Sequence, residues 1–127
     1  KPRSLLQELG TEVIRKKIDE MFLVNRIIND IKVYSYYLDV ITISDTRLPI
    51  EIETIKKELD NVISINIKRP GFENSLNQKE KTHITETALD NYHGFDYEII
   101  NDGTLEDLKI KAEKIFDEVI KDEKTNK

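Results

Sequence analysis

The feature that most constrains the fold is an apolar stretch that ends on an acidic residue. Residues 39–44 read Asp-Val-Ile-Thr-Ile-Ser, and Asp45 and Arg47 follow directly. A short β-branched run of this kind is typical of a buried strand in a parallel sheet. In open α/β sheets, ligands bind just beyond the carboxyl ends of such strands. The pattern therefore predicts a strand at residues 39–44 with Asp45 and Arg47 at a ligand site.

The chemistry of these two side chains supports two interpretations. An aspartate can hold a cation or its bound water, and the planar fork of an arginine suits a phosphate or a carboxylate. The same two residues can also form a cap at the strand end and a surface ion pair. The spacing alone does not separate a ligand site from this structural role.

Composition narrows the class of protein. The 127 residues fit one domain, and the net charge of −5 argues against a broad face for binding nucleic acid. Cysteine is absent, and the two histidines lack metal-ligand spacing, so disulfides are excluded and a zinc site is not expected. No apolar run approaches the roughly 20 residues that span a bilayer. We therefore expect a soluble, cytoplasmic protein that binds neither nucleic acid nor a membrane.

The first thirty residues carry two apolar stripes at helical spacing. Leu5, Leu9 and Val13 recur every four residues, and a second stripe begins at Phe22. A break is expected around residues 18–20. The pattern predicts two helices that each bury one of these stripes, and the second stripe contains Phe22, Val24, Ile27, Ile28 and Ile31.

Further along the chain, helical and strand patterns alternate. Pro49 suits the first turn of a helix that runs to residue 59, and strands are expected at residues 62–67 and 97–100. Thr104 and Asp107 fit the capping box of a final helix. That helix should bury an apolar face made by Leu105, Leu108, Ala112, Ile115, Phe116 and Val119.

Two segments lack a clear period. Residues 71–83 are polar and read as a long surface loop, which in a compact domain is usually a functional lid or disordered. A short helix is expected at residues 86–91. Residues 122–127 form a charged tail that we expect to fray from the final helix.

Three strands separated by helices predict an α/β fold, a parallel sheet with flanking helices and right-handed crossovers. The carboxyl ends of the strands then share one edge. That edge would gather Asp45 and Arg47, Lys68 and Arg69, and Asn101 and Asp102. A polar rim with charges of both signs suits a polyanion bound with a divalent cation.

Several short motifs occur together in a fixed order. They are Pro2-Arg3 with Gln7, Gly10-Thr11-Glu12 with Arg15, Ser44 to Pro49 with Glu51, Arg69-Pro70, His83 to Glu86, and Asn101 to Thr104 with Leu108. In this order and spacing the chain resembles the deoxynucleoside monophosphate kinases of phages and bacteria, from about residue 2 to residue 119. These enzymes belong to the P-loop nucleotide kinases.

The resemblance implies roles for individual residues. Asp45 sits like the acid near the magnesium ion, Arg47 like an arginine that touches substrate phosphate, and Arg69 like a catalytic residue at the start of a lid over residues 69–86. The last strand-to-helix turn resembles the part of the fold beside the adenine, here Asn101, Asp102, Gly103 and Thr104. Residues 1–32 resemble the helical region that binds the monophosphate, with Arg3, Gln7, Thr11, Glu12 and Arg15 as the substrate-binding residues.

One family motif does not occur in the sequence. No G-x-x-x-x-G-K-[ST] pattern is present, and none of the four glycines precedes a lysine. In the family, this phosphate-binding loop follows the first strand, which lies between the strands expected at residues 39–44 and 62–67. We therefore expect a C-terminal portion of a kinase, one α/β domain over residues 1–121 that lacks the N-terminal strand and its loop. The start at Lys1 without a methionine agrees with this expectation.

Two functions follow from this pattern. The first is phosphoryl transfer from ATP, with Mg²⁺, to a nucleoside or deoxynucleoside monophosphate in the intact protein, the present chain alone being inactive. The alternative is a non-catalytic interaction or regulatory domain descended from such a kinase. The sequence does not specify which monophosphate is accepted, and it leaves a homodimer open.

Overall fold

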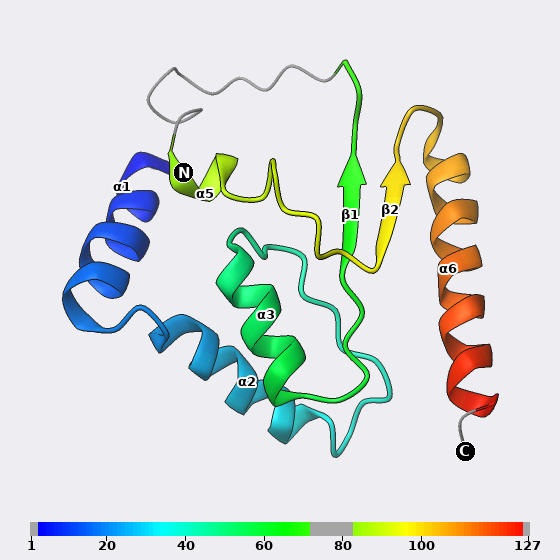
Figure 1. Cartoon of the computed structure of the whole chain (residues 1–127), viewed down its shortest axis with the longest axis horizontal. Helices are drawn as coiled ribbons and strands as arrows, with labels where there is room; N and C mark the ends of the chain where they lie inside the picture. Colours follow the sequence, from blue (N-terminus) through cyan, green and yellow to red (C-terminus); the bar gives the residue numbers. More distant parts are fainter. Residues whose placement is uncertain (1–2, 72–82, 126–127) are drawn as a thin grey trace. The chain divides into compact units, whose positions relative to one another are not determined.

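The structure is a computed structural model, and it describes residues 3–71 and 83–125 of the chain (Figure 1). Four helices come first in the described residues, and helices and strands alternate only from α3 onward, so the chain contains both kinds of element that the predicted α/β class requires. The elements in chain order are α1 (Arg3–Gln7), η1 (Glu8–Ile18), α2 (Phe22–Tyr34), α3 (Pro49–Glu58), β1 (Ile65–Lys68), α5 (Ile84–Thr87), β2 (Tyr97–Ile100) and α6 (Leu105–Thr125).

The described residues divide into two compact units. Unit 1 contains residues 3–62 and 83–92, and unit 2 contains residues 63–71 and 93–125. Each unit is described here by itself. The single domain expected over residues 1–121 stays a prediction.

The core of unit 1 lies between α2 and α3. Val24 and Ile28 on α2 and Ile55 on α3 are buried, and the exposed fraction of Val24 is 1%. This confirms that the stripe beginning at Phe22 contains the inward face of α2, although Phe22 itself is half exposed. Hydrophobic residues packed around this core are Met21, Ile27, Ile43, Leu59 and Val62.

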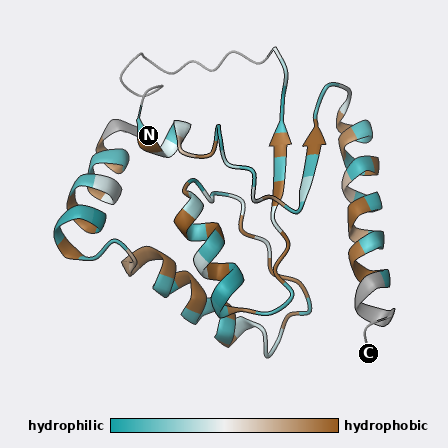
Figure 2. Cartoon of the chain, viewed as in Figure 1, coloured by the Kyte–Doolittle hydropathy of each residue, from teal (hydrophilic) through white to brown (hydrophobic). Residues whose placement is uncertain are grey.

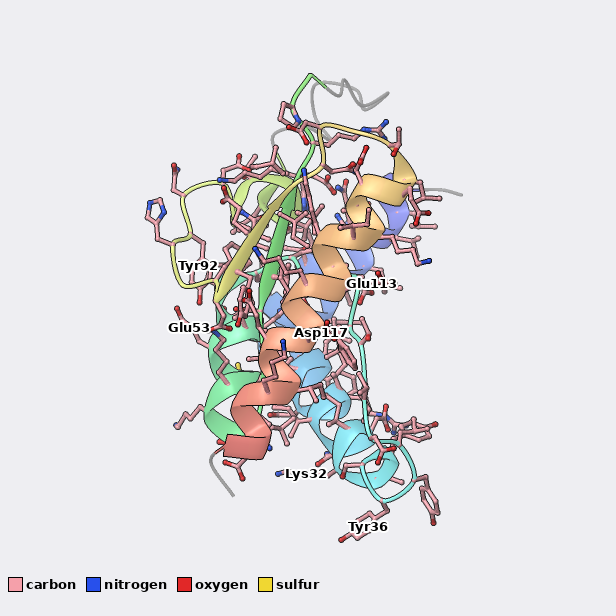
Figure 3. The ribbon with its side chains drawn as sticks, turned by 90° about the vertical axis from the view of Figure 1, so that its right-hand side faces the viewer. Lys32, Tyr36, Glu53, Tyr92, Glu113 and Asp117 are labelled. Atoms are coloured by element: carbon pink, nitrogen blue, oxygen red, sulfur yellow. The ribbon has the colours of Figure 1, made fainter. Side chains whose placement is uncertain are left out.

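The chain between the first two helical stripes breaks where the sequence predicts. The backbone N–H of Asp19 donates to the Ile14 carbonyl, and the side chain of Asp19 accepts from the N–H of Met21. This side chain thereby satisfies a backbone donor just before α2 begins. At the other end of α2, Tyr36 lies on the surface with 85% of its area exposed (Figure 3).

The first stripe behaves differently from the prediction. Residues 8–18 form a π-helix, η1, and Leu5, Leu9 and Val13 are 59%, 48% and 36% exposed. A π-helix pairs residues five apart, so its turn is wider than that of an α-helix. The buried side of η1 is polar, since Thr11 is buried and the side chain of Arg15 is only 11% exposed. The predicted inward orientation of the leucine stripe is therefore wrong.

Residues 39–44 do not form the predicted strand. They run without regular structure toward α3, and Ile43 packs against the core of unit 1 while Val40 is 58% exposed. A strand exists only when a neighbouring strand shares its hydrogen bonds. Among the described residues, strand pairing links only β1 and β2. Burial of Ile43 alone does not create a sheet, and the predicted three-stranded sheet is reduced to two strands.

Unit 2 is built around the parallel pair of β1 and β2. Ile67 pairs with Ile99 and Lys68 with Ile100 in the ladder, which confirms the predicted parallel arrangement for these two strands. Ile99 is buried, and α6 packs beside β2 (Figure 1). In contrast, Ile65 and Ile67 are 42% and 57% exposed, so β1 presents hydrophobic side chains to solvent. Figure 2 colours the chain by the hydropathy of its residues, with hydrophobic segments in brown.

The final helix begins as predicted and ends later. The N–H of Thr104 donates to Asp107 Oδ2 at 2.8 Å, and the N–H of Asp107 donates back to Thr104 Oγ1 at 3.2 Å. This reciprocal pair is the capping box. The backbone of α6 remains helical to Thr125, so the tail expected from residue 122 is helical over most of its length.

The boundaries of the short helix α5 differ from the predicted ones. The short helix runs over residues 84–87, so it starts two residues earlier and ends four residues earlier than predicted. It starts at Ile84 because the side chain of His83 accepts from the N–H of Thr85. Most of the lid expected over residues 69–86 lies outside the described residues, at positions 72–82. None of the helices in the described ranges is long and apolar enough to cross a membrane.

Candidate functional site

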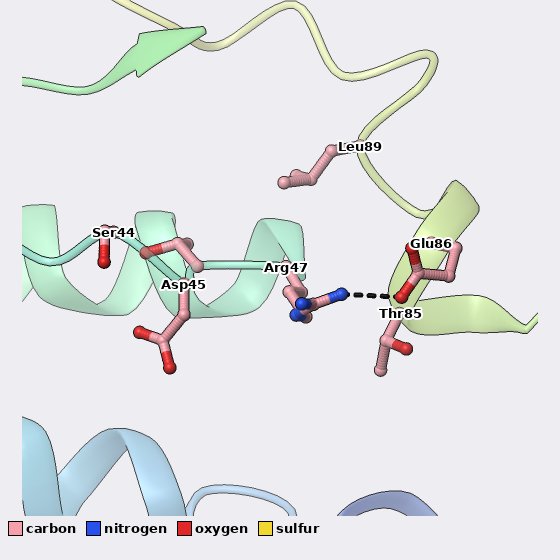
Figure 4. Close-up of a pocket in the computed structure, with 7 residues that line it drawn as sticks. Ser44, Asp45, Arg47, Thr85, Glu86 and Leu89 are labelled. Carbon is pink, nitrogen blue, oxygen red and sulfur yellow. Dashed lines mark hydrogen bonds and ion pairs between the residues drawn. The ribbon is translucent and has the colours of Figure 1, made fainter. Parts of the chain in front are cut away.

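A polar cavity of about 220 Å³ lies in unit 1 where the chain approaches α3. One wall comes from the segment before α3, and the other comes from α5 and the turn after it (Figure 4). Asp45 and Arg47 therefore line the same cavity, even though no strand precedes them. Their place at a ligand site stays a prediction. The lining residues are Ser44, Asp45, Thr46, Arg47, Thr85, Glu86 and Leu89.

Arg47 reaches across this cavity to α5. Its guanidinium donates to Glu86 Oε1 at 2.6 Å, and the same oxygen accepts from Gln7 Nε2 at 3.5 Å. The side chain of Glu86 is 16% exposed and that of Arg47 is 44% exposed. Figure 4 shows Arg47 extended toward Glu86, whereas the carboxylate of Asp45 turns away from this pair. The cavity thus contains a charge-assisted pair beside a separate carboxylate.

Glu51 fixes the position of the segment that carries Arg47. Its Oε2 accepts from the backbone N–H groups of Arg47, at 2.7 Å, and Leu48, at 3.0 Å, while its Oε1 accepts from Arg15. Pro49 begins α3, so Glu51 stands at the third helical position, where a carboxylate can satisfy donors that precede the helix. One side chain therefore caps α3, holds the backbone at Arg47 and binds η1.

Unit 1 brings together four predicted site residues through these contacts. Gln7 binds Glu86, Arg15 binds Glu51, and Asp45 and Arg47 line the cavity. The side chain of Arg15 is 11% exposed, and its second amino group donates to the carbonyl of Glu20. Arg15 is therefore largely enclosed by groups of the chain itself.

The remaining predicted residues of the helical region differ in position. Thr11 is buried in η1, and Arg3 is the first residue of α1. Glu12 is exposed and pairs with Lys16, one turn further along η1. The hydrogen bond from Lys16 lowers the pKa of Glu12 below its ordinary value. The predicted substrate-binding residues thus occupy both the inward and the outward side of the N-terminal helices.

The other predicted site residues belong to unit 2, where the two strands end together. The N–H of Asn101 donates to the carbonyl of Lys68 at 2.7 Å, and Arg69 follows Lys68 on the exposed chain after β1. Lys111 Nζ donates to the Ile100 carbonyl at 2.6 Å and to Asp102 Oδ1 at 2.8 Å. The carboxyl ends of these two parallel strands lie side by side, as predicted, while the role of Arg69 and of residues 101–104 in a site stays a prediction.

The turn into α6 is shaped by one glycine. A Cβ on Gly103 would lie 2.6 Å from Asp107 Oδ2, the oxygen that accepts from Thr104. Glycine at this position therefore permits the capping box. The hydrogen bonds from Thr104 lower the pKa of Asp107, and Lys111 lowers that of Asp102.

The described residues contain no group of three or more histidine, cysteine, aspartate or glutamate side chains that could hold a metal ion. A magnesium ion that binds together with a nucleotide needs fewer protein ligands than such a group provides. It commonly takes one or two carboxylates, with phosphate oxygens and waters completing the shell. Asp45, at the wall of a polar cavity, fits the part of such a carboxylate.

These features define a protein of mixed helices and strands with a charged pocket that combines two carboxylates and an arginine. The sequence matches the deoxynucleotide monophosphate kinase family over residues 2–112, and the chain belongs to that family.

Two phage proteins illustrate the similarity. The deoxynucleotide monophosphate kinase of Escherichia phage RB69 is 36% identical over 115 residues, and that of Enterobacteria phage T4 is 35% identical over 116 residues. The alignments cover 90% and 86% of this chain but 44% and 43% of the relatives, so the chain spans less than half of their length. No solved structure matches the chain at a significant level.

Sequence reasoning did not identify Glu51 and Glu86 as site residues. A signal for Glu51 exists, because an acid two residues after Pro49 is placed to cap the helix that Pro49 starts. Glu86 lies 39 residues from Arg47, and no local pattern connects the two.

Proposed function

We propose that the intact protein transfers a phosphoryl group from ATP to a deoxynucleoside monophosphate. The observation that carries this proposal is the placement of Asp45 and Arg47 in one polar cavity of a chain that belongs to the family. The names of the two phage relatives support the substrate class. Such a reaction needs no covalent nucleophile, since positioning and charge neutralisation supply most of the catalysis.

In this proposal, unit 1 binds the acceptor monophosphate. Arg47 is 44% exposed and carries its guanidinium into the cavity, where a phosphate can receive two parallel hydrogen bonds. Asp45 would hold Mg²⁺ directly or through water. The predicted acceptor-orienting residues are Arg3, Gln7, Thr11, Glu12 and Arg15.

Unit 2 would contribute to binding of ATP. The turn from Asn101 to Thr104 is proposed to lie beside the adenine, and Arg69 to act at the start of a lid over residues 69–86. The close approach at Gly103 and the capping box that follows it give this turn a fixed backbone shape.

The ATP phosphates would be held by a segment that this sequence does not contain. No G-x-x-x-x-G-K-[ST] pattern occurs in the 127 residues, and the relatives are more than twice the aligned length. We propose that a strand carrying this loop pairs beside β1. Among the described residues β1 pairs with β2 alone, which leaves its other edge open to a further strand, and the exposed Ile65 and Ile67 lie on a sheet face that the helices of an α/β fold normally cover.

The alternative function, a non-catalytic domain derived from such a kinase, rests on a different observation. Both candidate phosphate-binding arginines of unit 1 already pair with carboxylates, Arg15 with Glu51 and Arg47 with Glu86. Pairs of this kind are compatible with a site that no longer binds phosphate.

A phosphoryl-transfer assay separates the two functions. Radiolabelled ATP is supplied with a panel of nucleoside and deoxynucleoside monophosphates, to the 127-residue chain and to a version extended upstream through the glycine and lysine motif. We expect turnover by the extended protein and none by the 127-residue chain, because isolated charges in water hold phosphate weakly.

Two other outcomes of this assay would contradict these expectations. Turnover by the 127-residue chain alone would mean that its ATP phosphate site is built in another way. An extended protein that carries the motif, folds and binds ATP but transfers nothing to any monophosphate would favour the non-catalytic domain.

A further inference from the structure

The cavity in unit 1 already contains an anion bound to its arginine. Glu86 Oε1 accepts from Arg47 at 2.6 Å and also from Gln7 at 3.5 Å, and its side chain is only 16% exposed. A phosphate that binds the guanidinium of Arg47 must therefore compete with this carboxylate or share the arginine with it.

The charges around the cavity make this competition strong. The lining residues include two carboxylates, Asp45 and Glu86, and one guanidinium, so their formal charge is −1. Arg15, the other candidate phosphate contact in this unit, is enclosed by Glu51 and the carbonyl of Glu20. Among the described residues of the cavity, the positive charge of Arg47 is thus already balanced before an anion binds.

On the basis of the proposed function, we infer that Glu86 is a specificity-determining residue that reserves Arg47 for dianionic phosphomonoesters. A phosphomonoester carries up to two negative charges and three terminal oxygens, so it can replace the single carboxylate with stronger charge-assisted hydrogen bonds. A phosphodiester carries one negative charge, as Glu86 does, and gains no advantage over it.

The residues that surround Glu86 support an exchange of partners. Glu86 belongs to the short helix α5, while Gln7 comes from α1 and Arg47 from the segment before α3. When Arg47 turns to a phosphate, the amide of Gln7 remains within hydrogen-bond distance of Glu86. The carboxylate therefore keeps a donor, which lowers the free energy needed to release the arginine.

The change in phosphate affinity when Glu86 is removed distinguishes a residue that competes with phosphate from one that positions Arg47. If Glu86 competes with phosphate, its removal frees Arg47 and binding becomes tighter. If Glu86 instead holds Arg47 in the orientation that binds phosphate, its removal weakens binding. A purely structural role gives no change beyond that caused by the lost charge.

The test uses the 127-residue chain with three variants, Glu86→Gln, Arg47→Gln and Glu53→Gln. Glu53→Gln removes the same charge from an exposed position on α3 that does not line the cavity, and is the matched control (Figure 3). Affinities for deoxyadenosine 5′-monophosphate and for its methyl phosphodiester are measured by NMR titration at about pH 8, where the monoester is dianionic.

We expect Glu86→Gln to bind the monoester about fivefold more tightly, the upper range for loss of a partly exposed ion pair. The diester should gain more than the monoester, so that discrimination between the two falls. Glu53→Gln should change neither the affinities nor the discrimination by a comparable amount. Arg47→Gln should lose binding of both ligands.

Other results would overturn the inference in distinguishable ways. Unchanged or weaker binding by Glu86→Gln, in a chain whose wild-type binding is lost in Arg47→Gln, rejects the role of Glu86 and leaves the proposed function standing. If neither the wild type nor any variant binds the monoester, the acceptor site at Arg47 is rejected as well. Glu86→Asp, which keeps the charge and shortens the reach, replaces Glu86→Gln if the latter does not fold, and tighter binding is expected again.

Discussion

At the scale of single residues, the two arginines of unit 1 differ in a way that their sequence positions do not reveal. Arg47 is 44% exposed and lines a cavity, whereas Arg15 is 11% exposed and binds Glu51 and a backbone carbonyl. Hydrogen bonds between charged groups contribute about 1.5–3 kcal/mol when one partner is not exposed to solvent. Arg15 therefore stabilises the junction of η1 and α3, and Arg47 remains accessible to a ligand.

This difference predicts opposite outcomes for one substitution. Arg47→Lys should weaken monophosphate binding while leaving the melting temperature nearly unchanged, because lysine retains the charge but loses the planar fork. Arg15→Lys should instead lower the free energy of unfolding by about 1 kcal/mol, since one ammonium cannot replace both of its contacts. Thermal melting and monophosphate titration measure both effects. Equal melting temperatures and equal affinities in the two variants would reduce both arginines to surface ion pairs.

Asp45 carries a prediction of its own. If Asp45 holds Mg²⁺, Asp45→Asn in the intact protein should lower kcat by about 100-fold or more, as loss of a charge that acts in the transition state does. The melting temperature should stay nearly constant, because the residue is exposed. Asp30→Asn, which removes an exposed aspartate paired with Arg26, is the control. Equal turnover by Asp45→Asn and the wild type would remove the magnesium role.

At the scale of elements, local signals predicted the helices well. Pro49 starts α3, the Thr104 and Asp107 pair starts α6, and the break before α2 occurs at Asp19. Each of these signals involves residues that lie within a few positions of one another. It can therefore be recognised in the sequence without knowledge of the fold. These elements also position Arg47 and the turn at Gly103.

Elements that depend on distant partners were predicted less well. Residues 39–44 carry a strand pattern, but a strand requires a partner that the described chain does not pair with them. The wider turn of η1 exposes Leu9, which α-helical spacing places inside. The contact of Arg47 with Glu86 spans 39 residues, and only the folded chain reveals it. The contact between the two walls of the cavity could therefore not be predicted from residues that are neighbours in the sequence.

The capping box of α6 predicts a dependence on pH. Hydrogen bonds from Thr104 lower the pKa of Asp107 from its ordinary value of 3.8, so the folded state favours the charged carboxylate. The stabilisation is fully present above that ordinary value and is lost as the pH falls through the lowered pKa. Amide hydrogen exchange in the first turn of α6, taken relative to the rate of an unstructured chain at the same pH, should therefore accelerate as the pH falls below that ordinary value of 3.8.

Two variants check the origin of this effect. Asp107→Asn should remove most of the pH dependence in the first turn, and Gly103→Ala should raise exchange there at neutral pH by forcing the carboxylate away from Thr104. Exchange that accelerates equally in Asp107→Asn and the wild type would assign the pH dependence to other groups.

At the scale of the whole molecule, hydrophobic side chains are exposed in both units. Leu5, Leu6 and Leu9 are 48–59% exposed in unit 1, and Ile65 and Ile67 are 42% and 57% exposed in unit 2. Exposed apolar groups that lie close together commonly mark surfaces covered by another part of a protein. In the described residues of unit 2, β1 pairs with β2 alone, so one edge of β1 stays open.

The last prediction follows from this exposure. A protein extended upstream through the proposed phosphate-loop strand should melt at a higher temperature than the 127-residue chain, because a strand beside β1 would share the hydrogen bonds of its open edge and the chain that connects this strand would cover the face on which Ile65 and Ile67 lie. The fluorescent dye ANS, which binds accessible apolar surface, should bind the 127-residue chain more strongly than the extended protein. Replacing Ile67 by threonine should reduce dye binding by the short chain and destabilise the extended protein. If extension changes neither the melting temperature nor dye binding, then the exposed face of β1 is not where the additional strand packs.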